Sequence, residues 1–343
     1  MKHWLACAAV LLLAACSRDP EVVVYTSADE DVAKPVFERF QRETGIKVVP
    51  KFDSEATKTT GLASQLRAER ERPRADVFWS NEQASVVQLA ADGVLAGCDP
   101  AVLAAWPAAW KDPNGRWASL AGRARVIVYA PERVPDPPQR WTDLLNPKWK
   151  GRIAMADPRF GTTRGHMGAM KAYWDEHAMP GYFEAWAEGL AENAPKVLTS
   201  GNAGVVDAVA RGEADLGMTD TDDVLAAQAR GLKVQMVQPR HVRDDRVKGG
   251  GTMLVPNTVG MVAGAQHPAE AARFLAFMLS EATERQLAAM PAHHAPVVAA
   301  PAEGDLAVAD PLAVDAAAAA AASDAAVEAF LKARRELDKK GGT

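Results

Sequence analysis

The chain has 343 residues, a formal net charge of −5 and a sequence pI near 5.9. Its basic residues are dispersed among acidic ones, which excludes the concentrated basic surface that nucleic-acid binding requires. A chain of this length can bury substantial apolar cores, and two lobes are more typical of it than one.

The first residues predict a lipoprotein signal. An apolar stretch over residues 5–13 ends in Leu13-Ala14-Ala15-Cys16, which resembles the bacterial lipobox, where the signal is cut before a cysteine that then carries lipid. We therefore expect residues 1–15 to be a signal peptide, Cys16 to be lipidated and residues 16–20 to form a tether. An ordinary secretory signal is the alternative. The apolar stretch is too short for a permanent membrane span.

The next segments alternate between strand and helix patterns. Residues 21–25 form an unbroken apolar run typical of a buried strand, and residues 32–40 repeat apolar positions at helical spacing. Further strands are predicted at 46–49 and 75–79, with a helix between them. Strands that alternate with helices in this way predict a parallel sheet.

A second α/β set follows a proline-rich interval at residues 131–138. A strand is predicted at 151–156, and further strands at 213–218 and 233–237 are separated by helical patterns.

The last third of the chain predicts two strand-like segments and two helices. The segments at 252–255 and 259–262 precede an amphipathic helix at 269–279. The alanine tract at 316–322 reads as a helix or spacer without chemistry, and a final amphipathic helix follows it.

Three strand-to-helix junctions carry clustered acids. In open α/β sheets, ligands bind outside the carboxyl ends of the strands, so these junctions are expected to line one cleft. Each acid could instead have a purely structural role, because the helix dipole stabilises acidic side chains in the first turn of a helix. Several acids exceed what capping needs and would repel one another without a cation. We therefore predict these cation ligands: Asp29, Glu82, Asp222 and Asp223. Ser27, at the first of these junctions, is predicted to bind the ligand or its anion.

A fourth junction has the opposite character. Gly161, Thr162 and Thr163 open a helix with small residues and hydroxyl groups, which is an anion-binding arrangement. A simple threonine N-cap is the alternative. Nearby in the expected fold, Arg123 and Arg125 alternate on a strand, and we expect one of them to form an ion pair that bridges the lobes.

The order of several segments resembles the ferric-iron-binding proteins of bacterial ABC importers. The matching segments are Val24-Tyr25-Thr26-Ser27, Ala75-Asp76-Val77-Phe78-Trp79, Gly122-Arg123-Ala124-Arg125-Val126, Asn146-Pro147-Lys148-Trp149-Lys150-Gly151 and Gly212-Glu213-Ala214-Asp215. The resemblance implies the two-lobed α/β fold of type II periplasmic binding proteins, which close on a ligand between the lobes.

The resemblance also implies lobe boundaries. The N-terminal lobe would comprise residues 21–122 and about 252–290, and the C-terminal lobe residues 123–251 and about 291–343. The chain would cross between the lobes near residues 123–129 and again near 248–254.

The same resemblance bears on the ligand. In many iron-binding members two adjacent tyrosines follow the strand that corresponds to residues 216–218, where this chain has Asp222-Asp223. A histidine or tyrosine often stands at the position of Asp29, a glutamate ligand falls at or beside Glu82, and the loop at 161–163 holds a synergistic anion. The implied cargo is ferric iron on carboxylates, since carboxylate oxygens suit hard cations. A polyamine or an aminophosphonate is the alternative.

The predicted function is a monomeric solute receptor, not an enzyme. The resemblance implies an ABC permease and its ATPase as partners, and Cys16 implies attachment to a membrane. A carboxylate-based hydrolase or a ligand sensor is the rival class. The sequence has no Gly-x-Ser-x-Gly elbow, phosphate-binding loop or His-Glu-x-x-His motif to support hydrolysis or transfer.

Overall fold

The computed structural model describes residues 19–53, 60–300, 302–308 and 310–341. The predicted signal peptide, Cys16 and most of the predicted tether lie outside these ranges. In the described part of the chain, no helix combines the length and apolarity needed to cross a membrane.

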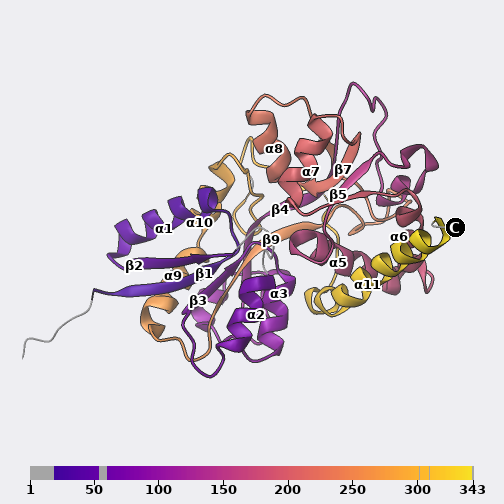
Figure 1. The fold of residues 1–343 in the computed structure, drawn as a ribbon. Coiled ribbons are helices and arrows are strands. Elements are labelled where there is room, and N and C mark those ends of the chain that lie inside the picture. The colour runs from indigo at the N-terminus through magenta and orange to yellow at the C-terminus, as the bar shows by residue number, and fades with distance from the viewer. Residues whose placement is uncertain (1–18, 54–59, 301, 309, 342–343) are drawn as a thin grey trace, which may run out of the picture.

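Two α/β halves share one strongly curled sheet (Figure 1). Its strands run in the order β2-β1-β3-β9-β4-β7-β5-β6, and β8 pairs with β4. The strands are β1 (Glu21–Thr26), β2 (Lys47–Phe52), β3 (Val77–Ser80), β4 (Ala118–Tyr129), β5 (Ile153–Ala156), β6 (Lys196–Leu198), β7 (Leu216–Asp220), β8 (Gln235–Val237) and β9 (Leu254–Met261). The α-helices are α1 (Glu30–Thr44), α2 (Thr60–Ala68), α3 (Ala84–Ala91), α4 (Pro100–Leu103), α5 (Gly161–His177), α6 (Tyr182–Glu192), α7 (Gly201–Ala210), α8 (Thr221–Ala229), α9 (Pro268–Met278), α10 (Glu281–Ala289) and α11 (Ala316–Gly341).

We call the half around β1, β2 and β3 the N-lobe. Strand β1 pairs in parallel with β2 and with β3, which confirms the parallel pairing predicted for this part of the chain. Apolar side chains cover both faces of these strands, as the unbroken run of valines requires. Val22 and Val24 pack in the core under α1 and α9, while Tyr25 and Phe78 belong to the core under α2 and α3.

We call the half around β5, β6 and β7 the C-lobe. Strand β5 pairs in parallel with β6 and β7. One face of the sheet is covered by α5, α6 and α11 over a core that contains Trp141, Trp186 and Phe330. The other face is covered by α7 and α8 over a smaller core around Val126 and Val205.

Two long antiparallel strands connect the lobes. The first part of β4 pairs with β9, and its second part, from Arg125 to Tyr129, pairs with β7. Strand β9 is one strand, where the sequence predicted two segments at 252–255 and 259–262. Pro256 and Asn257 interrupt the apolar pattern, but both are buried and both pair with β4, across a register shift between Leu120 and Gly122. The crossing predicted near residues 123–129 therefore lies within β4, and the one predicted near 248–254 leads directly into β9.

Two predictions concern the C-terminal region. Ala292 and Val298 still pack against the N-lobe core, so we place the last crossing after Val298 and not near residue 290. The alanine tract at 316–322, predicted as a helix or spacer, is helical and forms the first turns of the continuous helix α11.

Candidate functional site

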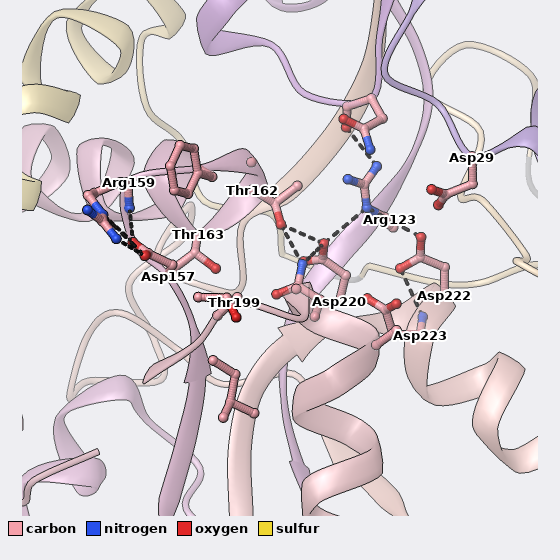
Figure 2. A pocket seen from close by; sticks show the side chains of 18 residues that line it. Asp29, Arg123, Asp157, Arg159, Thr162, Thr163, Thr199, Asp220, Asp222 and Asp223 are labelled. Carbon is pink, nitrogen blue, oxygen red and sulfur yellow. Dashed lines mark hydrogen bonds and ion pairs between the residues drawn. The ribbon is translucent and has the colours of Figure 1, made fainter. Parts of the chain in front are cut away.

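A cavity of about 320 Å³ lies where the two lobes face each other, outside the carboxyl ends of β5 and β7 (Figure 2). It is lined by Asp29, Asn81, Arg123, Ala156, Asp157, Arg159, Phe160, Gly161, Thr162, Thr163, Leu198, Thr199, Gly201, Asn202, Ala203, Asp220, Asp222 and Asp223. Its position is the one expected for a ligand site in an open α/β sheet. It contains six of the eight cavity residues that the sequence predicted.

One wall of the cavity is acidic. Asp222 and Asp223 lie in the first turn of α8, and Asp29 reaches the cavity from the N-lobe at the start of α1 (Figure 2). Asp220, Asp222 and Asp223 each offer a carboxylate oxygen, and these atoms lie within 4.8 Å of one another. Carboxylates at this spacing can share one cation.

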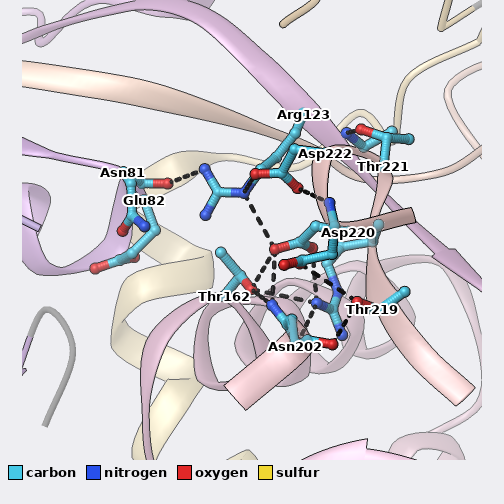
Figure 3. A network of polar contacts seen from close by, with 12 residues as sticks. Asn81, Glu82, Arg123, Thr162, Asn202, Thr219, Asp220, Thr221 and Asp222 are labelled. Atoms are coloured by element: carbon cyan, nitrogen blue, oxygen red, sulfur yellow. Dashed lines mark hydrogen bonds and ion pairs between the residues drawn. The ribbon is translucent and has the colours of Figure 1, made fainter. Parts of the chain in front are cut away.

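Asp220 is already satisfied by the protein itself. Its carboxylate accepts hydrogen bonds from Arg125 Nη1 at 2.7 Å, Arg123 Nε at 3.1 Å, Thr162 Oγ1 at 2.7 Å and Asn202 Nδ2 at 2.8 Å (Figure 3). Burial alone would raise the pKa of Asp220, but the two arginines outweigh it and hold this pKa below its ordinary value. Asp220 is therefore a structural anion that fixes its neighbours.

Asp222 and Asp223 have far less compensation. Burial and the charges of Asp220 and Asp29 raise the pKa of Asp222 to about 6, although Arg123 Nε lies 3.4 Å from its carboxylate. Burial and the neighbouring Asp222 raise the pKa of Asp223 well above its ordinary value. The pair therefore holds its protons to a higher pH than ordinary aspartates do, and a positive charge in the cavity would favour their release.

Arg123 connects the two lobes at the cavity. Its Nη1 donates to the backbone oxygen of Asn81 at 2.7 Å, while its Nε contacts Asp220 and Asp222 in the C-lobe. The sequence predicted a lobe-bridging ion pair at one of the two arginines on this strand. Arg123 does bridge the lobes, but its ion pairs lie on the C-lobe side and its N-lobe contact is a hydrogen bond to a backbone oxygen. Arg125 is fully buried and pairs with Asp220 inside the C-lobe.

The opposite wall is built from two helix N-termini. No side chain caps the start of α5 or of α7. The first residues of both helices line the cavity: Gly161, Thr162, Thr163, Gly201, Asn202 and Ala203. Two uncapped N-termini that converge on one space provide free N–H donors and positive dipole ends, which favour an anion.

Thr163 gives this wall an unused donor. Its side chain lines the cavity, and its hydroxyl is buried without a hydrogen-bond partner among the described residues. The hydroxyl of Thr162, by contrast, is committed to Asp220. A buried hydroxyl without a partner is costly, so a ligand oxygen that bonds Thr163 would stabilise the site.

Two sequence-predicted residues lie outside the cavity wall. The Glu82 carboxylate accepts from the backbone N–H groups of Ala84 at 2.7 Å and Ser85 at 3.0 Å, so it caps α3. Ser27 Oγ donates to Asn81 Oδ1 at 3.0 Å within the N-lobe. Glu82 was predicted as one of the acids that exceed what capping needs, but at α3 this acid is itself the cap.

Sequence reasoning missed six polar residues of the wall. These are Asn81, Asp157, Arg159, Thr199, Asn202 and Asp220. Arg159 is paired with Asp157, so its positive charge is largely neutralised. The N-terminus of α7 had a signal in the small, polar stretch Ser200-Gly201-Asn202-Ala203-Gly204, which follows a short strand in the same way as residues 161–163.

No tyrosine takes part in the site. The chain has four tyrosines, all within the described ranges, and none of them lines the cavity. Tyr25, for example, is buried in the N-lobe and its hydroxyl contacts Glu69. Burial and Glu69 raise the pKa of Tyr25 to about 12, which opposes any phenolate role.

Comparison with known proteins places the chain among solute receptors. Residues 22–290 match the family described as bacterial extracellular solute-binding protein. The chain is 25% identical over 299 residues to iron uptake protein A1 of Synechocystis, which covers 81% of this chain and 79% of that protein. It is 28% identical over 294 residues to the major ferric iron-binding protein of Neisseria meningitidis, covering 83% and 84% of the two chains.

The fold has matching solved structures. Iron-bound HitA from Pseudomonas aeruginosa superposes with a TM-score of 0.77 at 25% identity, covering 92% of this chain and 99% of that one. The agreement over nearly both whole chains confirms the predicted two-lobed periplasmic binding-protein architecture.

Proposed function

Since this chain belongs to the family of bacterial extracellular solute-binding proteins, we propose that it captures ferric iron together with an oxyanion and delivers the iron to an ABC importer. Its ligand would be held between the lobes, and the protein would act as a receptor without catalysing a reaction. A permease and an ATPase are the partners that such a receptor requires.

The observation that carries this proposal is the acid pair Asp222 and Asp223. Two half-buried carboxylates one residue apart face a cavity that offers them one guanidinium, that of Arg123. Their raised pKa values show that the folded protein holds them together at an electrostatic cost. A bound cation removes that cost, because each carboxylate then gains an opposite charge.

Iron is favoured among cations by the donor atoms and by the relatives. Carboxylate oxygens are suited to hard cations. The proteins from Synechocystis and Neisseria that resemble this chain over most of its length are an iron uptake protein and a ferric iron-binding protein. Asp29 on the N-lobe would add a third carboxylate when the lobes close on the metal.

An oxyanion would complete the coordination of the metal. A hard cation generally takes about six oxygen ligands, whereas Asp29, Asp222 and Asp223 supply three if each carboxylate gives one oxygen. The N-termini of α5 and α7 and the Thr163 hydroxyl form the opposite wall. An oxyanion there could bind the protein with one side and the metal with the other.

A thermal-shift experiment tests the proposal. The full chain in detergent, after treatment with a chelator, is titrated with Fe³⁺ in the presence of bicarbonate, citrate or phosphate. Binding to the folded state raises the melting temperature by mass action. Asp222→Asn combined with Asp223→Asn should abolish the rise, because both carboxylate ligands are lost while size and hydrogen bonding are nearly kept.

The matched control is Asp175→Asn with Glu176→Gln, an adjacent acid pair on α5 that is exposed and outside the cavity. This variant should respond to iron like the unmodified chain. A melting shift only with a polyamine or an aminophosphonate would keep the receptor role and overturn the iron assignment. Such a zwitterion also fits a cavity with one acidic and one anion-binding wall.

We further propose that the protein is anchored by lipid at Cys16 and acts as a monomer outside the cytoplasmic membrane. The lipobox resemblance of Leu13-Ala14-Ala15-Cys16 supports the anchor. Cys16→Ser should move the protein from the membrane to the soluble fraction of fractionated cells. If the variant stays with the membrane and still incorporates no labelled fatty acid, the anchor lies elsewhere.

A further inference from the structure

Helix α11 contacts both lobes, although its sequence looks like a featureless spacer. Along most of its length it packs on α5 and α6 of the C-lobe (Figure 1). Its first turns also reach α3 of the N-lobe. Ala319 and Ala326 belong to the C-lobe core, whereas Ala320 is buried in the N-lobe core under α2 and α3.

On the C-lobe side the contact is locked. A Cβ atom at Gly168 of α5 would lie 2.4 Å from the backbone oxygen of Ala319 and 2.4 Å from Ser323 Oγ. The two helices therefore approach as closely as their backbones allow, and only glycine fits at this crossing. Arg164 of α5 also bonds Asp324 at 2.7 Å. Helices α5 and α11 must move as one unit.

On the N-lobe side, the contact between α11 and α3 involves only small apolar side chains of α11. The buried surface that α11 presents to α3 consists of methyl groups, chiefly Ala320 with the partly buried Ala316 beside it. One side-chain hydrogen bond crosses this contact, from Gln88 Nε2 to the backbone oxygen of Ala320 at 2.9 Å. Larger side chains would form ridges that interlock with the grooves of the facing helix and resist sliding. Alanine methyl groups form no such ridges.

We propose that the alanine-rich start of α11, residues 316–323, is the sliding face on which the C-lobe moves against α3 when the lobes close. Shear between packed helices is an established mode of domain closure. Because α5 is locked to α11, the sliding face also positions the N-terminus of α5, which carries Gly161, Thr162 and Thr163 of the cavity. The inference takes its ligand from the proposed function, whereas the motion is inferred from the packing of the helices alone.

The test places a wedge in the sliding face and measures the distance between the lobes. Spin labels are introduced through unnatural amino acids at Glu38 of α1 and Glu188 of α6, both exposed, in the full chain in detergent. Distances are recorded by pulsed electron resonance without ligand and with ferric citrate. Ala320→Leu should shift the unliganded distances outward and weaken ferric citrate binding at least tenfold. Ala320→Val should lengthen the ligand-free distance and weaken binding by smaller amounts. If the leucine variant does not fold, the valine variant tests the sliding face.

Ala321→Leu is the matched control, because Ala321 is the next residue of the same tract and is exposed. It should leave both distance distributions unchanged, as should the conservative Ala320→Ser. Unchanged unliganded distances in both Ala320 wedge variants would overturn the sliding face, and so would an equal shift in Ala321→Leu. If ferric citrate does not change the distance between the labels in the unmodified chain, the iron assignment fails. The distances of the ligand-free variants still test the sliding face in that case.

Discussion

At the scale of single residues, the contrast between Asp220 and its two neighbours defines the site. Asp220 receives four side-chain donors and is fixed in its charged form. Asp222 and Asp223, two and three residues later, share one guanidinium at longer range. The same residue type thus serves once as a structural anion and, in our proposal, twice as a ligand for the cargo, according to the donors that the fold brings to it.

This contrast predicts an unusual dependence of stability on pH. The pKa of Asp222 rises from 3.8 to about 6 on folding, so between these values the folded state holds a proton that the unfolded chain has released. The free energy of unfolding without ligand must therefore fall as pH rises from about 4 to about 6, by an amount on the order of 2 kcal/mol. Cation affinity must rise over the same window, because the metal competes with that proton.

Melting temperatures of the ligand-free chain and of the Asp222→Asn, Asp223→Asn variant measure this effect. The variant should be the more stable protein near neutral pH, and its advantage should vanish below about pH 4. When the melting temperatures of the two proteins are subtracted at each pH, the contributions of the other titrating groups cancel. A difference that does not change with pH would show that the acid pair carries no strain.

Residue identity alone could locate this site but could not sort its acids. The junction rule placed Asp29, Asp222 and Asp223 in one cavity, because it depends on strand order, which the sequence pattern reveals. It also selected Glu82, whose carboxylate instead caps its own helix. Which oxygen caps a helix depends on a local backbone geometry that the order of residues leaves open.

At the scale of elements, the links between the lobes were the hardest part to predict. Alternating strands and helices identified β1, β3, β5 and β7 close to their observed positions. Strand β9 was expected as two segments, because Pro256 and Asn257 break its apolar pattern. Both are buried, and Asn257 bonds Trp79 at 3.0 Å, so long-range contacts override the local signal.

Another long-range contact at this scale fixes residues 297–299, where the chain leaves the N-lobe for the last crossing. Glu284 of α10 is fully buried and accepts four backbone N–H groups, from Ala121, Val297, Val298 and Ala299. Glu284→Ala would leave these donors without partners and should cost roughly 3 kcal/mol or more of stability. Thermal unfolding and amide hydrogen exchange at residues 295–299 are the measurements.

The neighbouring variant Glu281→Ala serves as the control for this anchor. Glu281 starts the same helix, but its side chain is 70% exposed, so its removal should change stability by about 1 kcal/mol at most. Similar losses for both variants would mean that the four donors find other partners and that Glu284 does not anchor the segment.

At the scale of the whole molecule, the cavity is assembled from both lobes with unequal shares. The C-lobe supplies Asp222, Asp223 and both helix N-termini, whereas Asp29 and Asn81 come from the N-lobe. A ligand can therefore bind first to the C-lobe and recruit the N-lobe afterwards. In that order of events, we propose Asp29 as the N-lobe charge that converts binding into closure.

Asp29→Asn should accordingly separate closure from binding. Loss of this carboxylate leaves the C-lobe wall intact, so ferric citrate should still bind, with affinity reduced about tenfold, or about 1.4 kcal/mol. The decrease in radius of gyration on binding, measured by small-angle X-ray scattering, should shrink or disappear. Asp31→Asn, an exposed acid in the first turn of the same helix, should compact like the unmodified chain. If Asp29→Asn closes fully, the N-lobe must be recruited by Asn81 and Arg123 instead, and Asp29 would be a surface acid that happens to face the cavity.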